Sequence, residues 1–165
     1  MQTVGIIGAG AWGTALAQVI RAAGRDVTLW AREAELVSHM QKNHENNQFL
    51  PGIKIDSAIK VSDSISEVTN SDILLIVVPA QHLRATLQSM KSSLRKDQPV
   101  LICSKGIEME SGLLMSQVAE QEIPNSPIGV LTGPTFAAEI AKGLPSAMTL
   151  AYKNADQGKE IIDAF

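Results

Sequence analysis

Short apolar runs alternate with apolar residues at helical spacing along almost the whole chain. The runs predict strands at Thr3 to Ile7, Asp26 to Trp30, Asp72 to Val78, Pro99 to Cys103 and Ile128 to Leu131, with shorter candidates at Lys60 to Ser62 and Ser146 to Ala151. The helical spacing predicts helices at Ala11 to Ala23, Ala34 to Lys42, Leu83 to Leu94, Leu113 to Glu122 and Thr135 to Lys142. Strands and helices that alternate in this way predict a parallel sheet covered by helices.

The run from Asp72 to Val78 is the most apolar of the predicted strands, and Pro79 ends it. Its hydrophobicity is continuous rather than alternating, which is typical of a strand buried on both faces. We therefore expect this strand at the centre of the sheet. The polar, proline-bearing stretch from Asn43 to Asp56 is predicted to be a loop.

The first predicted strand runs directly into the turn Gly8-Ala9-Gly10-Ala11-Trp12-Gly13, where a helix begins. Between a strand and a helix, G-x-G-x-x-G is the signature of a dinucleotide-binding turn. Gly8 permits the tight turn, Gly10 lets a pyrophosphate approach the backbone, and Gly13 lets the helix pack closely on the strand. The helix N-terminus offers the phosphates free N–H groups and a positive dipole end. The fold class predicted is α/β, a Rossmann-like, doubly wound, mainly parallel sheet with helices on both faces; a glycine-rich turn without a ligand is the alternative for the motif.

Composition and charge narrow the class of protein. The 165 residues are enough for one domain with its own core, and 45% apolar and 19% charged residues are typical of soluble globular proteins. The net charge of −3 gives no general attraction for nucleic acid or anionic membranes. The single cysteine excludes an internal disulfide, and neither a signal peptide nor a membrane-spanning run is apparent. We expect a cytoplasmic, soluble protein.

The end of the sequence carries a helix pattern without a clear stop. Asn154 is predicted to cap a last helix, and no terminal turn or cap signal precedes Phe165. Ile161, Ile162 and Phe165 are expected to form an apolar face with nothing after it. We therefore expect residues 1–165 to be one dinucleotide-binding domain at the front of a longer protein.

The end of the second predicted strand bears on the choice of dinucleotide. An acidic residue about 20 positions after the glycines holds the ribose 2′-hydroxyl of NAD, whereas an arginine there suits the 2′-phosphate of NADP. The strand ends at Trp30, and Arg32 comes before Glu33. Arg32 over the adenine ribose favours NADP without excluding NAD; an ordinary exposed pair of Arg32 and Glu33 is the alternative.

Two further strand ends place candidate groups at the same edge of the sheet, where open α/β sheets bind ligands. Pro79 ends the central strand, and it either faces such a ligand or simply starts the next helix. Lys105 follows the buried strand that ends at Cys103. An ammonium group there suits phosphates and carbonyl oxygens, and the alternative is a solvated loop lysine.

The segment from Leu131 to Glu139 again reads as strand, glycine and helix. Pro134 fits the first helical position, and the N–H groups near Thr135 can receive an anion or polar substrate. A plain helix start is the alternative.

The remaining polar and reactive residues are weak candidates for chemistry. We expect Cys103 to be a small core residue and Glu108 and Glu110 to lie in a solvated loop. The three histidines are scattered without metal-binding spacing, so no metal site is predicted; they are His39, His44 and His82.

Six segments, in order over the whole chain, resemble one protein family. They are Gly8 to Ala17, Leu29 to Arg32, Asn47 to Pro51, Val77 to Pro79, Ser104 to Glu108 and Gly133 to Ala137. The family is the bacterial NAD(P)-dependent glycerol-3-phosphate dehydrogenases. The resemblance implies an oxidoreductase that reversibly transfers a hydride between NADP or NAD and C2 of dihydroxyacetone phosphate. Its product, sn-glycerol 3-phosphate, would feed phospholipid synthesis.

The resemblance also implies roles for individual residues. Ala11, Trp12, Arg32 and Ala137 would contact the cofactor, Lys105 would contact both cofactor and substrate, and Gly133 and Thr135 would bind the substrate. With the glycine turn and the central strand end, the predicted cofactor site is Gly8, Gly10, Ala11, Trp12, Gly13, Arg32, Pro79, Lys105 and Ala137. The predicted substrate site within this chain is Lys105, Gly133 and Thr135.

The chain departs from the family pattern at its end. The family has a second, helical domain that carries the lysine acting as general acid and base, and possible homodimer contacts belong to the full-length protein. Hydride transfer to a carbonyl needs a proton for the developing alkoxide. We therefore expect this chain alone to bind the dinucleotide with little or no dehydrogenase activity.

Two other interpretations stay open at this point. One is a related reductase that acts on another small acid or carbonyl, against which the segments Ser104 to Gly106 and Gly133 to Phe136 argue. The other is a stand-alone dinucleotide-binding or redox-sensing module without catalysis.

Overall fold

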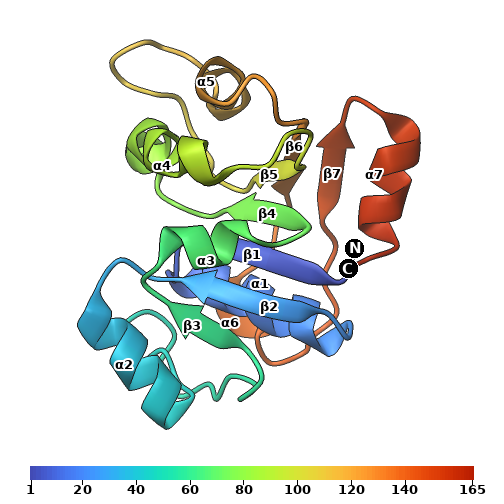
Figure 1. Ribbon diagram of the computed structural model, residues 1–165. Helices are drawn as coiled ribbons and strands as arrows, with labels where there is room; N and C mark the ends of the chain where they lie inside the picture. The colour runs from blue at the N-terminus through green and yellow to red at the C-terminus, as the bar shows by residue number, and fades with distance from the viewer.

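The computed structural model describes residues 1–165 as a seven-stranded sheet flanked by helices (Figure 1). The strands are β1 (Thr3–Ile7), β2 (Asp26–Trp30), β3 (Lys60–Ser62), β4 (Ile73–Ile76), β5 (Val100–Ile102), β6 (Ile128–Thr132) and β7 (Thr149–Tyr152). The helices are α1 (Ala11–Ala22), α2 (Ala34–Asn43), α3 (Ile65–Thr69), α4 (Leu83–Met90), α5 (Met115–Glu122), α6 (Ala137–Ile140) and α7 (Ala155–Ile162). Two 3₁₀ turns flank α4, η1 (Ala80–His82) and η2 (Lys91–Ser93).

The strand order is β3-β2-β1-β4-β5-β6-β7, so the chain builds the sheet outward in two directions from β1. Strands β1 to β6 are parallel, and β7 is antiparallel to β6, with Thr132 opposite Thr149. Because the strand order reverses at β1, a crevice opens between the carboxyl ends of β1 and β4. This doubly wound, mainly parallel arrangement is Rossmann-like and confirms the predicted fold class.

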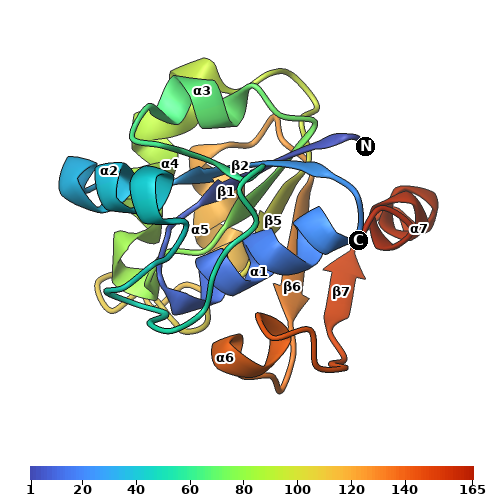
Figure 2. The same ribbon diagram turned by 90° about the horizontal axis from the view of Figure 1, so that it is seen from below.

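The central strand β4 is buried on both faces because its side chains alternate between two cores. Ile73 and Leu75 belong to the core that contains side chains of α1, α2, α6 and α7, and Leu74 and Ile76 belong to the core that contains side chains of α3, α4 and α5. All four side chains are fully buried. Figure 2 views the sheet from below and shows α1 and α6 on one side, with α3 on the other. The continuous apolar run in the sequence thus corresponds to a strand at the middle of the sheet, as predicted.

The first three strands begin and end at the predicted residues, and α1 and α2 differ from prediction by one residue. The long loop between α2 and β3 contains an isolated bridge between Glu45 and Lys54 but no regular element. Asn154 caps α7 as predicted, because its side-chain oxygen accepts a hydrogen bond from the Gln157 N–H at 3.0 Å. In these segments the hydrophobic pattern and the capping residues predict the same structure that the tertiary contacts stabilise.

One helix was missed, and two predictions about helices were wrong. The sequence did not indicate α3, whose five residues are too few for a period to be visible. Helix α4 ends at Met90, and Leu94 follows η2 in extended backbone rather than continuing the helix. Helix α6 begins only at Ala137 because Phe136 is extended, so Pro134 is not at a first helical position.

The predicted apolar face at the end of the chain was also wrong. Ile161 is 1% exposed and belongs to the core, whereas Ile162 is 61% exposed. Phe165 is half-buried and packs against the same core as Ile161. The helix ends at Ile162, with Asp163 at the C-cap. The three side chains therefore do not share one surface.

The helices are short relative to the thickness of a bilayer. None of them is both long enough and apolar enough to cross a membrane.

Candidate functional site

The turn between β1 and α1 has no room for a side chain at Gly8 or Gly13, but it has room at Gly10. Gly8 has a φ of +119°, and a side chain there would lie 2.5 Å from the Val77 carbonyl oxygen. A Cβ at Gly13 would lie 1.9 Å from the Gly8 carbonyl oxygen, whereas one at Gly10 would meet nothing within 4 Å. Gly10 is also the N-cap of α1 and supplies no side chain to the first-turn N–H groups. The turn thus leaves an exposed backbone surface and free donors at Gly10.

A buried asparagine from the long loop after α2 fixes this turn. Asn46 is fully buried, and its Nδ2 donates to the Ala9 carbonyl and to the Thr14 hydroxyl, each at 2.8 Å. Its Oδ1 accepts the Phe49 N–H at 3.0 Å. All polar atoms of the amide are therefore used, and the loop is fastened to the turn. Sequence reasoning missed Asn46, because it lies in a stretch with no periodic pattern.

A cavity of about 480 Å³ lies beside the turn, at the carboxyl ends of β1, β2 and β4. Its floor is the turn itself, and its walls come from the end of β2, from α4 and from the loop that Asn46 fastens. The lining residues outside the predicted cofactor site are Ala9, Trp30, Ala31, Glu33, Leu36, Phe49, Val77, Val78, His82, Ala85, Thr86 and Ser89. Their mixture of apolar and hydroxyl side chains can hold an apolar ring together with a polar sugar.

Arg32 and Glu33 stand together at the wall of this cavity. The Glu33 carboxylate accepts hydrogen bonds from Arg32 Nε at 3.0 Å and Arg32 Nη2 at 2.8 Å. The Arg32 side chain is 76% exposed, so this ion pair is solvated and adds little stability. The residues thus form the exposed pair of the alternative interpretation and also line the cavity, and a role of Arg32 at the adenine ribose stays a prediction.

A second cavity, of about 380 Å³, continues from the first along the same edge of the sheet. Gly10, Val77, Val78 and Pro79 line both cavities, so the two form one groove across the point where the strand order reverses. The remaining wall of the second cavity is Ala11, Trp12, Gly13, Cys103, Ser104, Lys105 and Thr135. The carboxyl ends of β4 and β5 thus meet the start of α1 and the segment after β6.

Lys105 lies at the rim of the second cavity and is exposed. Its Nζ donates a hydrogen bond to the Gly133 carbonyl at 3.1 Å, which joins the segments after β5 and β6. The Thr135 hydroxyl is buried and has no hydrogen-bond partner. An unpartnered hydroxyl and an ammonium group on residues that line the same cavity fit a polar ligand there.

Cys103 lines the same cavity but is not a candidate nucleophile. Its side chain is buried, and burial raises the pKa of the thiol to about 12. The thiolate is therefore scarce at neutral pH. The expectation that Cys103 is a small core residue is confirmed.

The structure gathers most of the predicted site residues along this groove. Those that line it are Gly8, Gly10, Ala11, Trp12, Gly13, Arg32, Pro79, Lys105 and Thr135. Gly133 lines neither cavity, and its carbonyl accepts the hydrogen bond from Lys105. Ala137 lines neither cavity; it begins α6 and packs against the core. Pro79 precedes η1 as well as lining the groove, so its two interpretations are compatible.

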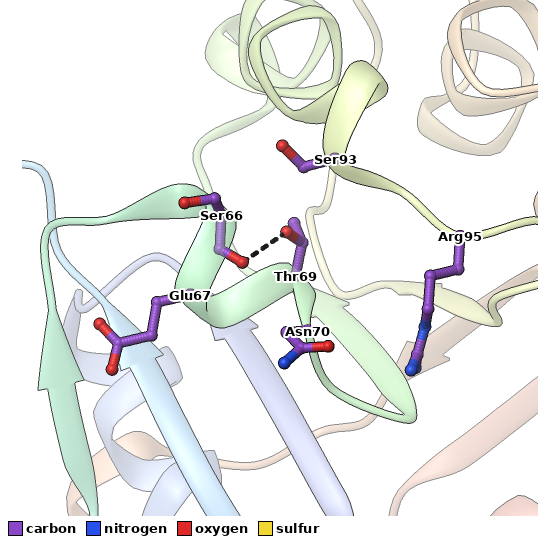
Figure 3. Close-up of a pocket in the computed structure, with 6 residues that line it drawn as sticks. All are labelled: Ser66, Glu67, Thr69, Asn70, Ser93 and Arg95. Carbon is purple, nitrogen blue, oxygen red and sulfur yellow. Dashed lines mark hydrogen bonds between the residues drawn. The ribbon is translucent and has the colours of Figure 1, made fainter.

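Another hollow of about 480 Å³ has a different character (Figure 3). Its lining is wholly polar and comes from α3 and the segments before β4 and β5: Ser66, Glu67, Thr69, Asn70, Ser93 and Arg95. Its polar groups already serve the protein, since Arg95 donates to the Ser71 carbonyl and Thr69 to the Ser66 carbonyl. It lies toward the amino ends of β4 and β5, away from the groove, and we do not assign it a ligand.

Glu108 was predicted to lie in a solvated loop, and this was wrong. The residue is 8% exposed, and its carboxylate accepts hydrogen bonds from Arg84 Nε at 2.9 Å and Arg84 Nη2 at 2.8 Å. The Ser111 hydroxyl also donates to it. These bonds lower the pKa of Glu108 to about 2. Glu110 is exposed, as expected.

No three side chains of His, Cys, Asp or Glu gather in a metal-binding arrangement anywhere in the chain.

Comparison with known proteins points to one family. Residues 3–158 match the family model described as the NAD-dependent glycerol-3-phosphate dehydrogenase N-terminus. The chain is 47% identical over 164 residues to the NAD(P)+ glycerol-3-phosphate dehydrogenase of Paramagnetospirillum magneticum, covering 99% of this chain and 60% of that protein. It is 48% identical over 163 residues to the enzyme of the same name from Caulobacter vibrioides, covering 99% of this chain and 49% of that protein.

A solved structure agrees with these relatives. The crystal structure of glycerol-3-phosphate dehydrogenase from Coxiella burnetii superimposes with a TM-score of 0.92 at 32% identity, over 99% of this chain and 50% of that one. The Plasmodium falciparum glycerol-3-phosphate dehydrogenase has a TM-score of 0.90 at 24% identity, which supports the fold alone. This chain therefore spans about half of the length of the proteins that it resembles.

The contrast between Gly13 and Gly10 gives a prediction about stability. We expect Gly13→Ala to lower the free energy of unfolding by about 1–3 kcal/mol or more, because the added methyl overlaps the Gly8 carbonyl. Gly10→Ala should lower the free energy of unfolding by less, about 0.5–1 kcal/mol, because the methyl meets no atom and only the N-cap preference for glycine over alanine is lost. Urea unfolding of both variants measures the difference. Equal losses of stability would contradict the geometry of the turn.

The lowered pKa of Glu108 gives a prediction about pH. The folded state favours the carboxylate, so this group contributes stability fully above its ordinary pKa of 4.5 and loses that contribution as the pH falls toward 2. We expect Glu108→Gln to unfold at lower urea concentration than the original protein at pH 7, with the gap closing between pH 4.5 and 2. Glu110→Gln, exposed on the same loop, is the control and should show no such gap. A gap for Glu108→Gln that is independent of pH would refute this account.

Proposed function

This chain belongs to the NAD-dependent glycerol-3-phosphate dehydrogenase family, and we propose that it is the cofactor-binding part of an enzyme that interconverts dihydroxyacetone phosphate and sn-glycerol 3-phosphate. The observation that carries the proposal is the groove at the switch point of the sheet, with the open backbone of Gly10 at its middle. The residues fit a dinucleotide. The larger cavity has walls suited to an adenosine, and the smaller one ends at Lys105 and the unpartnered Thr135 hydroxyl.

Different groups along this groove would bind different parts of the dinucleotide. The free N–H groups at the start of α1 would hold the pyrophosphate, where the absence of a side chain at Gly10 allows close approach. Arg32 and Glu33 would meet the ribose of the adenosine. When bound, the cofactor supplies or accepts the hydride.

Lys105 and the segment after β6 would orient the substrate. The Lys105 ammonium would attract a substrate oxygen or phosphate, and the Thr135 hydroxyl would bond a substrate oxygen inside the cavity. Reduction of the ketone adds a hydride to C2 and a proton to its oxygen, so a proton donor is also required. We assign that donor to a lysine of a second, helical domain outside residues 1–165, as the family resemblance implies.

Activity of the whole protein tests this proposal. We expect the protein that contains this chain to oxidise NADH or NADPH only when dihydroxyacetone phosphate is present, followed by absorbance of the reduced nicotinamide. The 165-residue chain alone should have kcat/KM at least about 100-fold lower, because the general acid is missing. Binding of the reduced cofactor without turnover by the whole protein would favour a dinucleotide-binding module instead. Substantial turnover by the 165-residue chain would contradict the assignment of the proton donor to a lysine outside residues 1–165.

The paired side chains at the ribose position give a prediction about cofactor choice. We expect Arg32→Ala to weaken NADPH binding by about 10- to 100-fold, because a charge-assisted bond to the 2′-phosphate is lost, and NADH binding by less than about 3-fold. Glu33→Gln releases Arg32 from its ion pair and should raise the affinity for NADPH relative to NADH. Fluorescence titration of each variant with both dinucleotides measures the effects. Equal losses of NADPH and NADH affinity in Arg32→Ala would rule out a role at the 2′-phosphate.

A further inference from the structure

The loop that carries Lys105 is held mainly by polar contacts rather than by burial. We call residues 105–114, between β5 and α5, the lysine loop. Ile107, Met109 and Leu114 in this loop are between 53% and 82% exposed, and Leu113 alone of its apolar side chains packs against a core. The loop therefore has little apolar burial to fix its position. Its position depends on other contacts.

One such contact is a close approach to η1, the 3₁₀ turn that follows Pro79. Gly106 has a φ of +133°, and a Cβ at this position would lie 3.1 Å from the Ala80 Cβ. The residue directly after Lys105 thus rests on the residue directly after Pro79. A side chain at position 106 would crowd the Ala80 methyl and strain the backbone next to the lysine.

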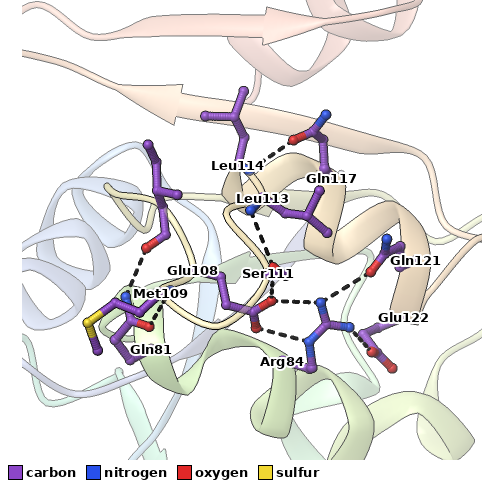
Figure 4. Close-up of polar contacts among 11 residues, drawn as sticks. Gln81, Arg84, Glu108, Met109, Ser111, Leu113, Leu114, Gln117, Gln121 and Glu122 are labelled. Atoms are coloured by element: carbon purple, nitrogen blue, oxygen red, sulfur yellow. Dashed lines mark hydrogen bonds and ion pairs between the residues drawn. The ribbon is translucent and has the colours of Figure 1, made fainter.

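A second contact is made by the side chain of Gln81, shown in Figure 4. Its Nε2 donates to the Ile107 carbonyl at 2.9 Å, and its Oε1 accepts the Met109 N–H at 3.0 Å. One amide thereby binds the loop backbone at two points, one donor and one acceptor. This pair of bonds fixes the register of the loop along η1.

A third contact is the ion-pair cluster around Arg84, in the first turn of α4 (Figure 4). Arg84 binds Glu108 of the lysine loop through two nitrogens, and it also donates to Glu122 and Gln121 of α5. The side chains of Arg84 and Glu108 are only 29% and 11% exposed. A bidentate pair that is partly withdrawn from water holds geometry better than a solvated one.

Successive residues of the loop are therefore held by the segment that follows β4. Gly106 rests on Ala80, residues 107 and 109 are bound by Gln81, and residue 108 is bound by Arg84. On the other side of Lys105, the Ser104 hydroxyl donates to the Val78 carbonyl. The residues on both sides of the lysine thus contact the segment that follows β4, and this segment also lines the groove.

We propose that Gln81 and Arg84 are positioning residues that hold the Lys105 ammonium at the substrate end of the groove. The inference rests on the proposed function for the role of Lys105, and on the structure for the contacts themselves. Neither Gln81 nor Arg84 lines either cavity, so both act through the lysine loop. Gln81 is the better probe because its side chain is exposed, and its substitution should leave the fold intact.

The first part of the test measures the contact without relying on activity. In the whole protein, Gln81→Leu removes both hydrogen bonds to the loop while roughly keeping the volume of the side chain. We expect hydrogen exchange of the Met109 amide to become at least about 10-fold faster, because its acceptor is lost. Gln88→Leu, on the exposed face of the neighbouring helix α4, is the matched control and should leave this exchange rate unchanged. Unchanged exchange in Gln81→Leu would refute the contact.

The second part asks whether the contact acts through Lys105. We expect Gln81→Leu to lower kcat/KM for dihydroxyacetone phosphate by about 10- to 100-fold, because the ammonium group is displaced. In a Lys105→Met background the same change should cost less than about 2-fold, since the group that it positions is gone. Gln81→Glu, which keeps the acceptor for the Met109 N–H, should be intermediate, and Arg84→Met should lose its effect in the same background.

Equal losses with and without Lys105 would show a purely structural role and overturn the proposal, as would full activity in Gln81→Leu. Arg21→Met is the control for Arg84→Met, because Arg21 is 27% exposed, also pairs with two carboxylates and lines neither cavity. It should leave kcat/KM unchanged. An unsubstituted protein without turnover would contradict the proposed function and, with it, the role of Lys105.

Discussion

The close packing of the turn from Gly8 to Gly13 against the segment after β4 and against its own backbone is the constraint on which the rest of the structure depends. A side chain at Gly13 would lie 1.9 Å from the Gly8 carbonyl, and one at Gly8 would lie 2.5 Å from the Val77 carbonyl. Strands β1 and β4 and helix α1 therefore meet at a point that has no room for side chains. Because they meet there, the free N–H groups of α1 open directly into the crevice between the two central strands.

The sequence predicted those parts of the fold in which local pattern and tertiary environment agree. Strand β4 was recognisable because both of its faces are buried, so every position from Ile73 to Ile76 is apolar. The turn from Gly8 to Gly13 was recognisable because neighbouring backbone leaves no room for a side chain at Gly8 and Gly13, while the backbone of Gly10 stays accessible. The parallel topology then determines which strand ends meet. This is why Pro79, Lys105 and Arg32, each next to a strand end, line one groove.

The rest could not be predicted because it depends on contacts between loops that are distant in sequence. Asn46 bonds the Ala9 carbonyl 37 residues away, and Arg84 bonds Glu108 24 residues away. A polar residue in a polar loop carries no pattern that separates a buried hydrogen-bonded role from a solvated one. Pro134 illustrates a related limit. Its chemistry suits a helix start, yet the extended backbone of Phe136 delays α6 to Ala137.

The polar contacts that could not be predicted, those of Asn46, Gln81 and Arg84, all hold loops that border the groove. The chain has a net charge of −3, and the groove itself offers only Arg32 and Lys105 as permanent cations. Arg32 is already paired with Glu33, so charge alone would hold a phosphate ligand weakly. Recognition then depends on placement, since backbone donors and a single ammonium group stabilise a ligand only when their positions are fixed in advance. Asn46 fixes the backbone donors from one side of the groove, and Gln81 with Arg84 fixes the ammonium group from the other.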